Sequence, residues 1–96
     1  MRNANEIALD LLTIALTVAR RAAVDYMAYY HLQADPAALE QSVIRRCKAE
    51  LPKSLHAAAK LSDTGLAAWA EVEFAADMTL AGIQAAQDVT HTRRND

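Results

Sequence analysis

The chain has 96 residues, with ten basic and twelve acidic side chains, a net charge of −2 and a single cysteine, Cys47. This length fits one helical domain over residues 1–96, and a lone cysteine excludes a disulfide-stapled secreted domain. Hydrophobic residues make up 53% of the chain but aromatic residues only 5%. Alanine therefore supplies much of the apolar surface, which favours long pairwise helix contacts over a bulky core.

A first helix is predicted over residues of about 4–32, with Asn3 or Asn5 as its N-cap. Its apolar side chains cover more than half of the circumference, whereas a helix on one neighbour needs an arc little wider than about 100°. We therefore expect cover from several sides, by the same chain or by a second copy. Asp10 and Thr13 interrupt the apolar stretch, so we expect no membrane span, no signal peptide and a cytoplasmic location.

A second helix is predicted over residues of about 36–61, because Asp35 is a good N-cap and Pro36 suits the first helical position. Pro52 removes one backbone hydrogen bond and costs about 3 kcal/mol in a helix interior. The apolar residues Val43 and Leu55 nevertheless stay on one face through the proline. A helix kinked at Pro52 is therefore favoured over two separate helices.

A third helix is predicted over residues of about 64–90, capped by Ser62 or Asp63. Gly82 near its middle indicates that another backbone passes close by. The helix carries two apolar stripes, of which one faces the other helices and the other needs a separate partner. The first stripe comprises Trp69, Val72, Ala76, Leu80 and Ile83, and the second comprises Phe74, Met78, Ala81, Ala85 and Val89.

These patterns predict an all-α fold, an antiparallel bundle of two to three long helices per chain that is completed by dimerisation. A two-fold dimer uses the same patch on both copies. The candidate interface comprises Ile7, Leu11, Ile14, Val18, Phe74, Met78, Ala81, Ala85 and Val89.

Candidate chemical groups are scattered along the chain. Glu73, Asp77 and Asp88 share a ridge of the third helix, but no glutamate is followed by histidine at the spacing that di-iron bundles use. His31, His56 and His91 fall on different elements, and Cys47 lies on the apolar stripe of the second helix. We therefore expect no catalytic residue, no metal and no cofactor.

The segment Leu55–Lys60 places His56 on the polar face of the second helix, and Gly65 lies shortly after it. It resembles the histidine phosphotransfer domains, helical bundles of about this length whose exposed histidine carries a phosphoryl group. The family pattern has a lysine three residues and a glycine four residues after that histidine, where this chain has Ala59 and Lys60. The resemblance covers about ten residues and implies a phosphotransfer protein or another helical-bundle enzyme as a further alternative.

Two surfaces are candidates for contact with a partner. The tyrosines near the end of the first helix provide flat area with polar tips, which is typical of interfaces; this contact cluster comprises Tyr26, Tyr29, Tyr30 and, as a possible neighbour, Trp69. The second helix carries a basic face that suits a phosphate backbone, made of Arg45, Arg46, Lys53, His56 and Lys60.

The leading hypothesis is a non-catalytic helical interaction or assembly module that forms homodimers and contacts a protein partner. The alternative is a small nucleic-acid-binding or regulatory protein that uses the basic face of the second helix. Nucleic acid is not favoured as the partner, because a solvated basic face is the commoner case.

Overall fold

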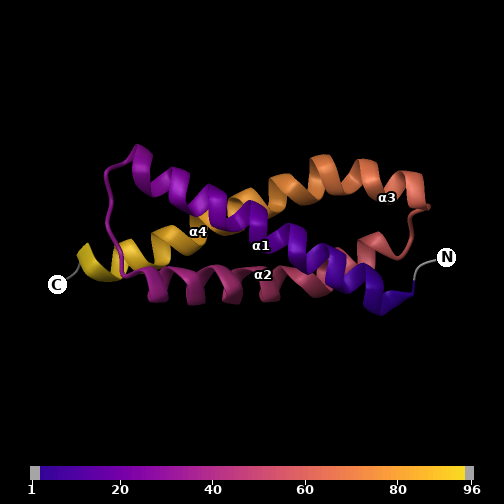
Figure 1. Ribbon diagram of the computed structural model, residues 1–96, viewed down its shortest axis with the longest axis horizontal. Helices are drawn as coiled ribbons and strands as arrows, with labels where there is room; N and C mark the ends of the chain where they lie inside the picture. Colours follow the sequence, from indigo (N-terminus) through magenta and orange to yellow (C-terminus); the bar gives the residue numbers. More distant parts are fainter. Residues whose placement is uncertain (1–2, 95–96) are drawn as a thin grey trace.

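The computed structural model describes residues 3–94 and is all-helical over that range, with no strand. The chain passes three times along the long axis of the molecule (Figure 1). The first two passes are α1 (Ala4–Tyr29) and α2 (Pro36–Ala58), and the third consists of α3 (Asp63–Trp69), the π-helical turn η1 (Ala70–Phe74) and α4 (Ala75–Arg94). α2 runs antiparallel to α1 and α4 (Figure 1). The prediction of an all-α fold with helices packed on one another is confirmed.

The helix starts follow from local capping. The side chain of Asn3 accepts a hydrogen bond from the Glu6 amide at 2.9 Å, and that of Asp35 accepts one from the Ala38 amide at 3.0 Å. Ser62, not Asp63, caps α3. Each cap satisfies an amide that the first turn of a helix leaves without a partner. α2 continues from Pro36 to Ala58 with Pro52 inside it.

α1 ends at Tyr29 instead of continuing to about residue 32. His31 adopts a left-handed conformation with φ of 55°, its amide donates to the Ala28 carbonyl, and the Leu32 amide donates to the Met27 carbonyl at 2.8 Å. This pair of bonds is a Schellman motif, with His31 at the position that glycine usually occupies. The motif turns the chain toward α2.

The core is built from small side chains that let the helices approach closely. α1 contributes every fourth residue from Leu11 onward, and α4 contributes residues on the side that faces α1 and α2. The buried hydrophobic residues of these two helices and η1 are Leu11, Ala15, Ala19, Ala23, Met27, Phe74, Met78, Ala81, Ala85 and Ala86. Gly82 lies directly against the backbone of Ala19, as its position in the sequence predicted.

The π turn η1 changes which side chains share a face. In an α-helix, residues five apart point about 140° away from each other, whereas the i→i+5 bonding of a π turn brings them to nearly the same side. Trp69 and Phe74 are five apart, and their rings stack with centroids 5.2 Å apart and planes 28° apart. The prediction that placed these two aromatics on separate stripes is therefore wrong.

The predicted roles of the two stripes are reversed. Phe74 and Met78 are fully buried within the single chain, whereas Val72 and Leu80 are exposed, Leu80 by 54%. The residues expected at an interface between copies but buried inside this chain are Leu11, Phe74, Met78, Ala81 and Ala85. The others are half-buried, and three of them, Ile7, Ile14 and Val18, pack against the core. A single chain covers these side chains because α1, α2 and α4 together surround them.

Candidate functional site

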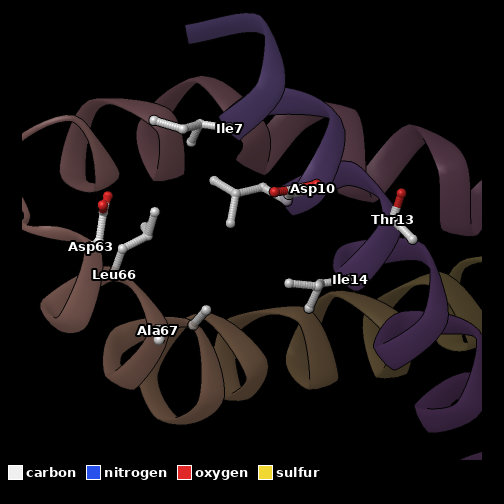
Figure 2. A pocket seen from close by; sticks show the side chains of 9 residues that line it. Ile7, Asp10, Thr13, Ile14, Asp63, Leu66 and Ala67 are labelled. Atoms are coloured by element: carbon white, nitrogen blue, oxygen red, sulfur yellow. The ribbon is translucent and has the colours of Figure 1, made fainter. Parts of the chain in front are cut away.

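A hollow of about 660 Å³ lies between the first half of α1 and α3. It exists because α1 and α3 diverge toward one end of the bundle (Figure 1). Figure 2 shows the apolar side chains of Ile7, Ile14 and Leu66 at the space between the two helices. No sequence pattern marks this hollow, since it depends on how far two helices separate in space.

The polar groups of the hollow come from opposite walls. Asp10 and Thr13 belong to α1, and Asp63 belongs to the first turn of α3 (Figure 2). The Thr13 hydroxyl donates to the Leu9 carbonyl of its own helix at 2.9 Å, so it is engaged locally. The hollow is therefore an apolar slot with carboxylates at its walls, and it suits an apolar group better than a reacting polar one.

A second surface lies where the end of α1 meets α4. Tyr26, Tyr29 and Tyr30 line a groove of about 340 Å³ together with Thr79 and Ile83. The rings of Tyr26 and Tyr30 lie 4.8 Å apart, as do those of Tyr29 and Tyr30. We call Tyr26, Tyr29, Tyr30, Thr79 and Ile83 the tyrosine face.

The tyrosine face has little charge. Asp25 lines the same groove, but its carboxylate lies 3.8 Å from Arg21, one helical turn earlier. The Tyr26 hydroxyl accepts a hydrogen bond from Gln87 of α4 at 3.3 Å, which fixes the two helices across the groove. Tyr29 is 76% exposed. The three tyrosines of the predicted contact cluster lie together, whereas Trp69 stacks on Phe74 and does not line this groove.

A polar bridge joins α2 to α4. The guanidinium of Arg46 donates to both carboxylate oxygens of Asp88, at 2.8 and 2.7 Å, and the buried Ser42 hydroxyl donates to the Ala85 carbonyl at 3.0 Å. Hydrogen bonds from Arg46 are the main cause that lowers the pKa of Asp88 below its ordinary value, with smaller help from Ser42. A bidentate pair of this kind fixes geometry as well as charge. The bridge therefore has a structural role, because it holds α2 against α4.

This bridge removes Arg46 from the predicted basic face. Arg45, Lys53, His56 and Lys60 are exposed on or just after α2, as predicted. Lys48, which the prediction left out, is exposed as well. At 100° per residue it falls on the same side of α2 as Arg45 and Pro52.

The remaining candidate groups do not converge. Glu73 and Asp77 are exposed, whereas Asp88 is held by Arg46. Within the part of the chain that the structure describes, no three His, Cys, Asp or Glu side chains gather where they could hold a metal. The side chain of His91 lies outside the described residues.

Cys47 is fully buried in the core, and burial raises the pKa of its thiol. A raised pKa leaves little thiolate at neutral pH, and the thiolate is the reactive form. The thiol therefore behaves as a small apolar core residue, as the sequence indicated.

None of the helices in the described part of the chain is long and apolar enough to cross a membrane. Comparison of the chain with protein-family models, with curated proteins and with solved structures finds no match.

Proposed function

We propose that this chain is a non-catalytic helical interaction module that forms a homodimer through the tyrosine face. The observation that carries the proposal is the cluster of exposed tyrosines at the end of α1 beside α4, with Tyr29 exposed by 76% and Tyr30 by 56%. Tyrosine is enriched in the centres of protein interfaces, where its ring is buried and its hydroxyl finds a partner.

The charges allow a second copy as the occupant. The repulsion between two copies of net charge −2 is screened by salt, and a neutral surface adds no local repulsion where the copies meet. The tyrosine face is such a surface, because Arg21 offsets the one carboxylate beside it, that of Asp25. A two-fold axis would place the same face on both copies, as closed dimers require.

The dimer is tested by sedimentation equilibrium from low micromolar concentrations to about 200 µM, where weak homodimers become populated. We expect a mass that rises from the monomer value of 10.5 kDa toward twice that value. Tyr29→Lys buries a charge in the interface and should weaken the dimer at least about tenfold, as at interface hot spots.

Val24→Lys is the matched control. Val24 is also exposed on α1, at 57%, but unlike Tyr29 it does not line the tyrosine face. Its substitution adds the same charge and should leave the dimer unchanged. A wild-type chain that stays monomeric throughout, or equal weakening by both substitutions, contradicts the proposal.

A further inference from the structure

The outer side of α2 carries a concentration of positive charge. Arg45, Lys48 and Lys53 are exposed there, with His56 on the same side and Lys60 in the turn after the helix. We call these five residues the α2 basic face. The two acidic residues of α2, Glu40 and Glu50, are only half-exposed and point away from it at 100° per residue.

The cations of this face differ from three arginines elsewhere in the chain, Arg20, Arg21 and Arg46. Arg20 binds Glu40 through its Nε at 2.8 Å, Arg21 lies near Asp25, and Arg46 binds Asp88. For Arg45, Lys48, Lys53 and Lys60, by contrast, no ion pair is formed within residues 3–94. Arg45 acts electrostatically on Asp88 and helps to lower the pKa of that carboxyl, whereas the charges of Lys48, Lys53 and Lys60 are available to an external anion.

The dimensions of the face fit a polyanion better than a single anion. Arg45 and His56 are eleven residues apart, about 16 Å at 1.5 Å per residue. One strand of duplex DNA carries a phosphate about every 3.4 Å of axis, so this length spans about five phosphates. The separation is too large for the side chains to close around one small ion.

The uncharged residues on this side of α2 further limit the class of partner that the face can bind. Ala49 and Pro52 are exposed between the cations and Gln41 lies one turn before Arg45, and none of the three offers a large apolar group to insert into a lipid surface. The face has no aromatic ring on which an unpaired base stacks. Its cations therefore suit the phosphates of a paired duplex, which receive half or more of protein–DNA hydrogen bonds.

From these observations we infer that the α2 basic face binds the phosphate backbone of a nucleic-acid duplex without reading its sequence. The exposed carboxylates of Asp63, Glu71, Glu73 and Asp77 lie on α3, η1 and α4. A duplex that approaches α2 is attracted by one helix and repelled by the others, so the binding is oriented. This inference is independent of the proposed dimer.

The test is fluorescence anisotropy with a labelled DNA duplex of random sequence, at several salt concentrations. Each phosphate contact contributes about −0.9 to the slope of the logarithm of the association constant against the logarithm of the salt concentration. Four contacts would therefore give a slope of about −3.6. Lys53→Gln should make that slope about 1 unit shallower and reduce the affinity up to about eightfold at 0.1 M salt, by the same relation. A second duplex of different sequence should bind equally well.

Arg21→Gln is the matched control, because it removes the same charge from an exposed side chain of α1. It should leave both the affinity and the slope unchanged. Circular dichroism melts confirm that both variants fold. The inference is overturned by an equal loss in Arg21→Gln, by undetectable duplex binding in low salt, by equally tight binding of polyglutamate, or by binding to phosphatidylserine vesicles in place of the duplex.

Discussion

Gly82 of α4 lies against the backbone of Ala19 of α1, with no room for a side chain between them. A Cβ atom at position 82 would overlap the carbonyl oxygen of Ala19 and would lie 2.9 Å from the Cα atom of Ala19. Backbone atoms cannot rotate away as a side chain can, so Gly82→Ala must push the two helices apart. We expect a loss of about 1–3 kcal/mol in the free energy of unfolding, measured by urea denaturation.

Gly65→Ala is the control for this prediction. A Cβ atom at position 65 meets the Ser62 hydroxyl oxygen at 3.2 Å, a contact that a small adjustment relieves. Alanine also gains up to about 1 kcal/mol of helix propensity over glycine at either position. The stability of Gly65→Ala should therefore stay within about 1 kcal/mol of wild type. Equal stability of the two variants would show that α1 and α4 do not meet at Gly82.

Local chemistry accounts for the features that were predicted well from the sequence. The caps Asn3 and Asp35 and the close approach at Gly82 each depend on one residue type in a fixed local setting. The early end of α1 was missed because His31 occupies a position that glycine usually marks. A histidine there gives no signal in the sequence.

Alanine substitutions in the two apolar stripes of η1 and α4 test which stripe is buried. Phe74 is fully buried and stacks on Trp69, whereas Leu80 is 54% exposed. Phe74→Ala should cost about 3–5 kcal/mol, the usual value for a buried phenylalanine. Leu80→Ala should change the stability by less than about 0.5 kcal/mol at concentrations where the chain is monomeric. Thermal or urea unfolding of the two variants gives the comparison, and similar losses would contradict the observed register.

Trp69 was assigned to the wrong stripe because a regular helical period was assumed from Thr64 to Thr90. The π turn Ala70–Phe74 rotates the side chains of α3 about the helix axis relative to those of α4. Counting at 100° per residue cannot detect such a turn. The candidate surfaces show a related limit. The three tyrosines lie within five residues and were found, whereas Asp88, the partner of Arg46, lies 42 residues away on a helix that only the fold brings near.

The Arg46–Asp88 pair makes part of the stability depend on pH. The lowered pKa of Asp88 means that the folded chain binds this proton less readily than the unfolded chain does. The stabilisation is fully present above the ordinary carboxyl pKa of about 4 and is lost as the pH falls through the folded-state pKa. Because both side chains are more than a third exposed, we expect Asp88→Asn to cost about 1 kcal/mol or less at pH 7.

The difference in unfolding free energy between wild type and Asp88→Asn should shrink below pH of about 4. Asp77→Asn removes the same charge from an exposed position of α4 and serves as the control. Its difference from wild type should be smaller at pH 7. If Asp77→Asn reproduces the pH dependence of Asp88→Asn, the effect comes from net charge and not from the bridge to Arg46.

Replacing His31 should stabilise the chain. His31 has φ of 55°, a conformation that costs a residue with a Cβ atom about 1–2 kcal/mol and costs glycine much less. The side chain of His31 is exposed, so little packing is lost when it is removed. His31→Gly should therefore raise the free energy of unfolding by up to about 1 kcal/mol, once the greater freedom of glycine in the unfolded chain is subtracted. Gln33→Gly is the control, because Gln33 is exposed in the same loop and lacks a positive φ. This variant should lower the free energy of unfolding. A loss of stability in both variants would show that the turn does not depend on the left-handed conformation at position 31.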